Sequence, residues 1–255
     1  MRIDAVELRQ VEMPYLFPFE TSFGREDTKV CLLVRVRTDG LEGWGEAPVM
    51  RAPLYNEETL GTAWHVLEEF IIPRVLGRTF DHPSEFPPLV ANLRRHHMAK
   101  AGLEAALWDL YSQAHRVPLT KALGGTRESV AVGVSLGIEP TMPALLGRIE
   151  TFLGQGFRRI KIKIKPGWDV DVVRAVRRQF GDILLQVDAN SAYALEDAPV
   201  FVAMDDYDLL LIEQPLAEDD IIDHAQLQRR LRTPVCLDES IVTAEDARKA
   251  IGLGA

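Results

Sequence analysis

The sequence predicts an α/β protein in two parts, a mixed α and β part over residues 1–125 and a parallel β/α part over residues 126–255. Strand-like runs occupy the first fifty residues, and the apolar period becomes helical from Glu57 onward. The pair Gly124-Gly125 marks the boundary between the parts. Beyond it, short apolar runs alternate with helical segments, which is typical of parallel strands joined by right-handed crossovers.

The first part begins with strands and ends with a long helix. Strands are expected over residues 3–11, 30–38 and 43–47, with a turn at Asp39-Gly40. Residues 18–27 contain Phe19, Phe23 and Gly24, and they predict an aromatic-rich loop. A helix follows, because its leucines recur every three or four residues around position 107.

The second part contains five β/α units. Strands are expected over residues 130–136, 160–164, 183–187, 209–212 and 235–237. Helices are expected over residues 142–154, 169–180, 198–204, 223–231 and 244–253. A closed (β/α)8 barrel needs eight strands, whereas a doubly wound sheet can be complete with five. The periodicity therefore leaves both folds open.

The composition excludes several classes of protein. The 255 residues include 38 acidic and 29 basic side chains, a formal net charge of −9, which disfavours nucleic acid and anionic membranes as partners. Two cysteines, Cys31 and Cys236, are too few for a secreted disulfide scaffold and predict a reducing cytoplasm. No run of about eighteen apolar residues is present, and Met1 to Gln10 does not resemble a signal peptide.

Three carboxylates end three successive apolar runs of the second part. Asp188, Glu213 and Asp238 are spaced 25 residues apart, one β/α unit each time. In neighbouring parallel strands this spacing brings them to the same carboxyl edge, where they would repel one another without a cation. A single strand-end acid more often caps a helix or shapes a loop, but three in equal register favour a site for a hard divalent cation such as Mg²⁺.

Three lysines alternate with isoleucines on the preceding run. Lys161, Lys163 and Lys165 share one face of the strand, as they would on a solvated edge strand. Because this strand precedes the one that ends in Asp188, the lysines would instead face the proposed cation. A lysine beside a dication has a lowered pKa and can act as a neutral base.

A second catalytic interpretation starts from residues 133–137, which match the G-x-S-x-G pattern of a hydrolase nucleophile elbow around Ser135. Asp188 and His224 follow in the order of a hydrolase triad. A helix should begin at once after the elbow, whereas prolines stand at positions 140 and 143. We therefore expect Ser135 to be a polar residue at a strand end.

Several motifs together resemble the enolase superfamily in its muconate-lactonising subgroup. They are IKIKIKPGWD (160–169), LLQVDAN (184–190), LLIEQPL (210–216), CLDES (236–240) and GLEAALWDL (102–110), the last similar to the final helix of the capping domain. The sequences of these motifs are most similar to those of o-succinylbenzoate synthases that also racemise N-succinylamino or N-acylamino acids. The resemblance implies a TIM-type (β/α) barrel, incomplete here at five units (126–255), with an N-terminal α+β capping domain (1–125).

The resemblance also implies a role for individual residues. Asp188, Glu213 and Asp238 would hold Mg²⁺ or another divalent cation such as Mn²⁺, with Glu239 supporting them. Lys163 would be the general base, acting with Mg²⁺ as a lysine does in this superfamily. Lys161 would support the charge of the substrate carboxylate and the metal. The pocket would be lined by Ser135 and Asn190 and closed by residues of two capping loops, Phe19, Phe23, Met50 and Tyr55.

The implied reaction is removal of a proton α to the carboxylate of a small molecule, followed by dehydration to o-succinylbenzoate for menaquinone biosynthesis, or by racemisation. Muconate cycloisomerase, dipeptide epimerase and an inactive metal-binding fragment are the alternatives. The resemblance further implies a homo-oligomer. Because the family's second catalytic lysine belongs on a sixth strand, we expect a chain truncated after residue 255, whose own activity is doubtful.

Overall fold

The computed structural model describes all 255 residues, which divide into two compact units. The first unit contains residues 1–15 and 28–130, and the second contains residues 16–27 and 131–255. No helix combines the length and the apolar character that crossing a lipid bilayer requires.

The first unit contains a three-stranded antiparallel sheet in the order β1-β2-β3. The strands are β1 (Ala5–Glu20), β2 (Arg25–Thr38) and β3 (Leu41–Ala47). Gly40, with φ of 74°, makes the turn between β2 and β3 that the sequence predicts. The prediction of a loop over residues 18–27 is wrong, because β1 and β2 continue to a short turn in which Thr21 N donates to Gly24 O at 2.8 Å. Pro18 is tolerated because β1 is an edge strand.

Helices cover this sheet and complete the core of the first unit. They are α1 (Leu60–Val66), α2 (Ile72–Val75), α3 (Phe86–Leu89), α4 (His97–His115) and α5 (Leu119–Ala122), with a π turn at Leu67–Ile71 and a 3-10 turn at Pro83–Glu85. The long helix α4 packs directly on β3 through glycine. A Cβ at Gly45 would lie 2.1 Å from the carbonyl oxygen of Gly102 in α4. No side chain fits between the two backbones there.

The second unit contains a five-stranded parallel sheet in the order β4-β5-β6-β7-β8. Its strands are β4 (Val134–Leu136), β5 (Arg159–Lys163), β6 (Leu184–Asp188), β7 (Ile212–Glu213) and β8 (Val235–Cys236). Its helices are α6 (Met142–Gly154), α7 (Val170–Phe180), α8 (Ala198–Met204), α9 (Ile222–Gln228) and α10 (Ala244–Leu253), with 3-10 turns at Leu195–Asp197 and Asp205–Tyr207.

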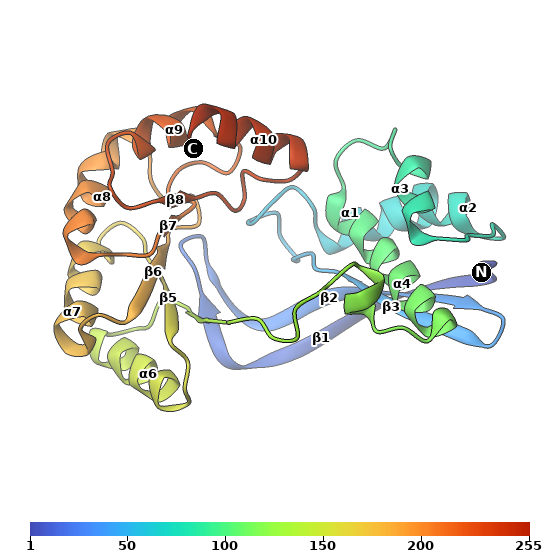
Figure 1. Ribbon diagram of the computed structural model, residues 1–255, viewed down its shortest axis with the longest axis horizontal. Helices are drawn as coiled ribbons and strands as arrows, with labels where there is room; N and C mark the ends of the chain where they lie inside the picture. The colour runs from blue at the N-terminus through green and yellow to red at the C-terminus, as the bar shows by residue number, and fades with distance from the viewer. The chain divides into compact units, whose positions relative to one another are not determined.

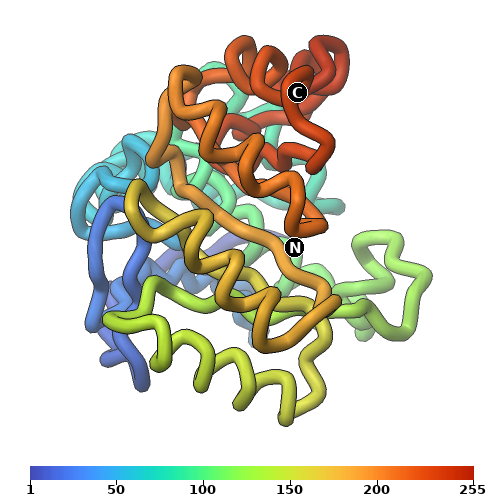
Figure 2. The backbone as a smooth tube through the Cα atoms, turned by 90° about the vertical axis from the view of Figure 1, so that its left-hand side faces the viewer, coloured from blue at the N-terminus to red at the C-terminus, as the bar shows by residue number.

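The strand order decides between the two folds that periodicity left open. Each strand pairs with its neighbour in sequence, so every crossover steps in the same direction and the helices cover one face of the sheet. Figure 1 shows α6 to α9 outside the curved sheet, and Figure 2 shows these helices from outside, one above the next in chain order. A doubly wound sheet would reverse direction and carry helices on both faces. The predicted partial (β/α) barrel is confirmed.

Strand β5 shows how the sheet separates an apolar from a polar face. Ile160, Ile162 and Ile164 are fully buried in the core between the sheet and the helices. Lys161 and Lys163 alternate with them and project from the opposite face. The helices therefore cover the apolar face, and the lysines lie on the face that the helices leave open.

Candidate active site at the carboxyl edge of the parallel sheet

One row of side chains crosses the carboxyl edge of the parallel sheet. Lys163 pairs in register with Asp188, Asp188 with Glu213, and Glu213 with Cys236. Residues in cross-strand register on neighbouring strands have side chains on the same face. Asp188 is 1% exposed and Glu213 is 8% exposed, so two carboxylates are buried side by side.

Two lysines neutralise these buried carboxylates. Lys161 Nζ lies 2.6 Å from Glu213 Oε1 and 3.1 Å from Asp188 Oδ2, and so bridges the two acids. Lys163 Nζ donates to Asp188 Oδ2 at 2.5 Å and to Asn190 Oδ1 at 2.6 Å. Buried charges persist in proteins when they are paired and hydrogen-bonded, as these four are.

The titration of the cluster follows from this pairing. Burial opposes the charged form of Asp188, but the ammonium groups of Lys163 and Lys161 outweigh burial and lower the pKa of the carboxyl. Burial likewise opposes the charge on Lys161, yet the carboxylates of Glu213 and Asp188 raise its pKa. The pKa of Glu213 is raised, because burial and the neighbouring Asp188 together exceed the effect of Lys161.

Asp238 does not share the register that equal sequence spacing implies. Glu213 pairs with Cys236, so Asp238 lies two residues farther along, beyond the end of β8, and it is exposed. No three side chains of the His, Cys, Asp and Glu types converge closely enough to hold a metal ion. The expectation of three acids in equal register is therefore wrong for Asp238. The charges of Asp188 and Glu213 are balanced by lysines within the sheet.

Asn190 joins the cluster to the loops that follow β6 and β8. Its main-chain N donates to Asp188 Oδ1 at 3.0 Å, and its side-chain Nδ2 donates to Glu239 Oε1 at 2.8 Å. Glu239 Oε2 is buried and has no hydrogen-bond partner. Burial first, and then the nearby charges of Asp238 and Asp188, raise the pKa of Glu239 to about 7. Asn190 is thus held between a lysine, a buried aspartate and a glutamate.

Ser135 lies on β4 in register with Lys161, so its side chain is on the face that carries the lysines. It is exposed and lies within a strand, and the next helix begins only at Met142. His224 is fully buried elsewhere; its Nε2 accepts from Leu216 N and its Nδ1 contacts Asp220. The nucleophile-elbow interpretation is therefore wrong.

The tip of the β1–β2 hairpin, residues 16–27, belongs to the second unit and lies at the same edge. Ser22 Oγ donates to the carbonyl oxygen of Asn190 at 2.9 Å, and Glu20 Oε1 lies 3.0 Å from Lys165 Nζ. The centre of the Phe19 ring is 5.9 Å from Lys163 Nζ, and Phe23 is half-buried in the same segment. Lys165 thus anchors the hairpin tip, whereas the other two lysines contact the acids.

Met50 and Tyr55 belong to the first unit, where both are half-buried. Met50 forms an isolated bridge with Thr59, and its carbonyl oxygen accepts from Leu60 N at 2.9 Å at the start of α1. Their contact with a substrate stays a prediction.

One residue at this edge, Gln214, was not predicted from the sequence. It directly follows Glu213 and is fully buried. Its φ is 36°, and Asn190 and Ser191 after β6 also have positive φ. Left-handed backbone at residues other than glycine is costly and gathers at functional sites. The only sequence signal is the position of Gln214 between a strand-end acid and Pro215.

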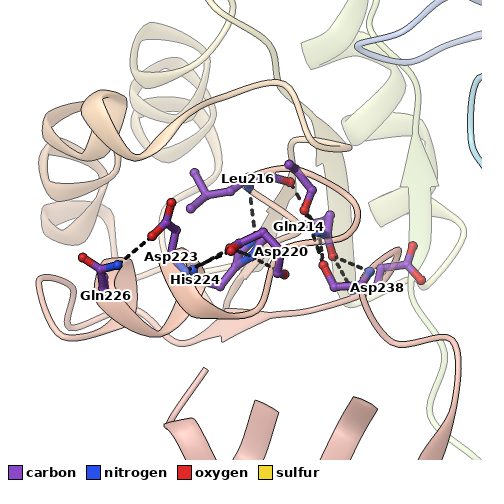
Figure 3. Close-up of polar contacts among 9 residues, drawn as sticks. Gln214, Leu216, Asp220, Asp223, His224, Gln226 and Asp238 are labelled. Atoms are coloured by element: carbon purple, nitrogen blue, oxygen red, sulfur yellow. Dashed lines mark hydrogen bonds and ion pairs between the residues drawn. The ribbon is translucent and has the colours of Figure 1, made fainter. Parts of the chain in front are cut away.

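The donor chemistry of the edge fits a hard divalent cation. Asp188 and Glu213 offer buried carboxylate oxygens from neighbouring strand ends, and Glu239 adds a buried carboxylate oxygen without a partner. Oxygen ligands of this kind are those that Mg²⁺ prefers. Asp238 follows β8 on the same edge, and Figure 3 shows its carboxylate pointing away from Gln214.

Comparison with known proteins identifies the fold family. The model "Mandelate racemase / muconate lactonizing enzyme, N-terminal domain" matches residues 3–124, and "Enolase C-terminal domain-like" matches residues 145–255. The o-succinylbenzoate synthase of Geobacillus kaustophilus is 53% identical over all of this chain and 68% of its own length. The N-succinylamino acid racemase of Thermus thermophilus is 52% identical over all of this chain and 69% of its own length.

A solved structure gives the same result. The dipeptide epimerase from Enterococcus faecalis V583, complexed with Mg and the dipeptide L-Leu-L-Tyr, superposes with a TM-score of 0.91 at 26% identity and covers all of this chain and 72% of its own. The sequential parallel sheet, the lysines and acids on its open face and these matches agree: the chain belongs to the mandelate racemase and muconate lactonizing enzyme family of the enolase superfamily.

Proposed function

We propose that the protein is an o-succinylbenzoate synthase, which removes the proton α to a carboxylate of a small-molecule substrate and then eliminates a hydroxyl group. The observation that carries the proposal is the row in which Lys163 adjoins Asp188 and Glu213 at the carboxyl edge. Curated relatives that are 46–53% identical over the whole chain and bear this name support it. In this proposal residues 1–125 form the capping domain and residues 126–255 carry the chemistry.

Asp188, Glu213 and Asp238 would hold a divalent cation, Mg²⁺ or Mn²⁺. When bound, the cation would stabilise the negative charge that develops on the substrate carboxylate as the α-proton leaves. Asp188 and Glu213 are already adjacent, whereas Asp238 would contribute from the loop after β8. Glu239, through its hydrogen bond with Asn190, would keep this loop against the end of β6.

Lys163 would be the general base. Its ammonium group is buried, and Asn190 Oδ1 and Asp188 Oδ2 fix the position of Nζ. A base must lie within hydrogen-bond reach of the proton that it removes, so a fixed Nζ is an advantage. Lys161, which contacts both acids, would offset the charge of the substrate carboxylate.

The remaining pocket residues follow from the same edge. Ser135 lies beside Lys161 on β4 and would line the pocket with Asn190. Phe19 and Phe23, on the hairpin tip, would cover the apolar part of the substrate, and Met50 and Tyr55 would do so from the capping domain. We also propose that the product serves menaquinone synthesis in the cytoplasm and that the protein is a homo-oligomer.

Racemisation of N-succinylamino acids is a second candidate. Relatives 52% and 50% identical are named N-succinylamino acid racemases, and the first step is the same proton removal. The second step differs, because a proton must return to the opposite face of the α-carbon. Dipeptide epimerisation has weaker support, since the epimerases matched are 24–27% identical.

A turnover experiment tests the proposal. The purified protein is mixed with Mg²⁺ and the precursor of o-succinylbenzoate, and product is followed by absorbance. Parallel samples contain EDTA, or an N-succinylamino acid in D2O for proton NMR. We expect product only with Mg²⁺, and exchange of the α-proton of the amino acid, because removal of that proton requires Lys163, whereas a second lysine is required only to return a proton to the opposite face. A folded protein that neither forms product nor exchanges the α-proton would contradict the proposal.

A further inference from the structure

We propose that Gln214 is a positioning residue that fixes the main chain of Asp238, and that the protein needs it for divalent cation binding. This inference rests on the proposed function, because it assigns Asp238 to the cation site. It begins from the register of β8, which ends its pairing with β7 at Cys236. Asp238 lies two residues farther on, where no strand pairing holds the chain.

The side chain of Gln214 takes the place of the missing strand pairing (Figure 3). Its Oε1 accepts from the main-chain N–H of Asp238 at 2.9 Å and from that of Ser240 at 3.3 Å. Both bonds reach across from the end of β7 to the loop after β8. Gln214 directly follows Glu213, so the end of β7 both carries one proposed cation ligand and holds the main chain of another, Asp238.

The amide nitrogen of Gln214 completes the arrangement. Nε2 donates to Ser240 Oγ at 2.6 Å, to Ala217 O at 3.1 Å and to Leu216 O at 3.3 Å. One end of the side chain must therefore accept while the other donates, and of the common side chains of this length only glutamine does both. In glutamate, a second oxygen would face two carbonyl oxygens.

The main chain of Gln214 adds two further bonds. Its N donates to Cys236 O at 2.8 Å, and its carbonyl oxygen accepts from Ser191 N at 2.9 Å. One fully buried residue thus connects the end of β7 to the loop after β6, to β8 and to the loop after β8. Its φ of 36° is unfavourable for a residue with a Cβ and is maintained only where the surrounding bonds determine it.

Gln228 provides a matched control. It also bridges to β8, with Oε1 accepting from Val235 N at 2.6 Å and Nε2 donating to the carbonyl oxygens of Thr233 and Leu231 at 3.3 and 3.4 Å. These bonds lie at the amino end of β8, away from Asp238. Gln214→Met and Gln228→Met therefore remove the same chemistry from opposite ends of one strand.

The test measures Mn²⁺ binding to the purified protein without substrate, by electron paramagnetic resonance of free Mn²⁺, together with urea unfolding. We expect Gln214→Met to raise the Kd for Mn²⁺ about 10- to 100-fold, the range typical for residues that orient metal ligands. We expect Gln228→Met to change it less than about twofold, as for independent sites, while both variants lose stability. Ser240→Ala, which removes one bond of Gln214, is a milder variant with a loss in the same direction.

Asp188→Asn distinguishes failure of the cation site from failure of the role proposed for Gln214. Two results would refute the role of Gln214 while the cation site stands, provided that Asp188→Asn abolishes Mn²⁺ binding. In the first, Gln214→Met and Ser240→Ala do not weaken Mn²⁺ binding. In the second, Gln228→Met weakens it as much as Gln214→Met does. If Asp188→Asn leaves binding unchanged, the proposed cation site is wrong and this inference falls with it. A loss confined to Asp188→Asn, Gln214→Met and Ser240→Ala supports both.

Discussion

Replacement of Lys163 by methionine tests the proposed base. Two effects are expected, one on the rate of proton removal and one on the free energy of unfolding. Loss of a general base lowers the rate by about 10²- to 10⁴-fold. Stability should change less than for a stranded buried charge, which costs about 3–5 kcal/mol. Asp188 keeps Lys161 at 3.1 Å and the main-chain N–H of Asn190 at 3.0 Å, so we expect a loss of about 1–3 kcal/mol.

The assay for Lys163→Met is exchange of the α-proton of an N-succinylamino acid in D2O, at saturating substrate and Mg²⁺, with urea unfolding to measure stability. Lys165→Met is the control, because Lys165 lies two residues beyond the end of β5 but pairs with Glu20 and is more exposed than Lys163. The half-buried pair of Lys165 and Glu20 is accessible to solvent, and such an ion pair contributes about 1 kcal/mol or less, so this variant should keep its rate to within about fivefold. Folded Lys163→Met that exchanges within about tenfold of the unaltered protein would refute the role of Lys163.

Three further predictions concern stability. Glu58→Gln should cost about 1–2 kcal/mol in urea unfolding, because the buried carboxylate caps the main-chain N–H groups at the start of α4, whereas the exposed Glu57→Gln should change stability by less than about 0.5 kcal/mol. Gly45→Ala should cost about 1–3 kcal/mol or more by thermal melting, since its Cβ would meet α4 at 2.1 Å; Gly61→Ala, with no atom nearer than 4.0 Å, should be neutral or stabilising. Burial lowers the pKa of His224 in the folded protein despite the nearby Asp220. The neutral imidazole therefore contributes fully to the free energy of unfolding above about pH 6.5, and this contribution is lost as the pH falls through the folded pKa. Measured by urea unfolding, the decrease in the free energy of unfolding from about pH 7 to about pH 5 should be smaller in His224→Gln.

The helices and strands of the second unit were largely predictable, because each has a clear physical signal. The apolar runs bounded by turn residues predicted β5 and β6 to within one residue at each end. The predicted limits of α6, α8 and α10 agree with the structure. The apolar periodicity could not predict the strand order, because that order depends on which strands pair.

The details of the site were less predictable, since register is a property of paired backbones and not of spacing. Equal spacing suggested that Asp238 would lie level with Glu213, but β8 places Cys236 there. The turn at residues 21–24 was missed because residues 18–27 predicted a loop. The edge position that lets β1 continue through Pro18 cannot be read from the sequence of one strand. Gln214 gave only a weak signal, its position between Glu213 and Pro215, because most of its side-chain bonds go to main-chain atoms that any sequence supplies.

The central claim is that the strand-end acids of β6, β7 and the loop after β8 form one divalent cation site. The most direct measurement is a crystal structure of the protein with Mn²⁺, with an anomalous difference map calculated at the manganese absorption edge. We expect one strong peak within bonding distance of the carboxylates of Asp188, Glu213 and Asp238, with Lys161 moved away from the two acids that it now bridges. A peak that lies elsewhere, or that contacts neither Asp188 nor Glu213, would contradict it.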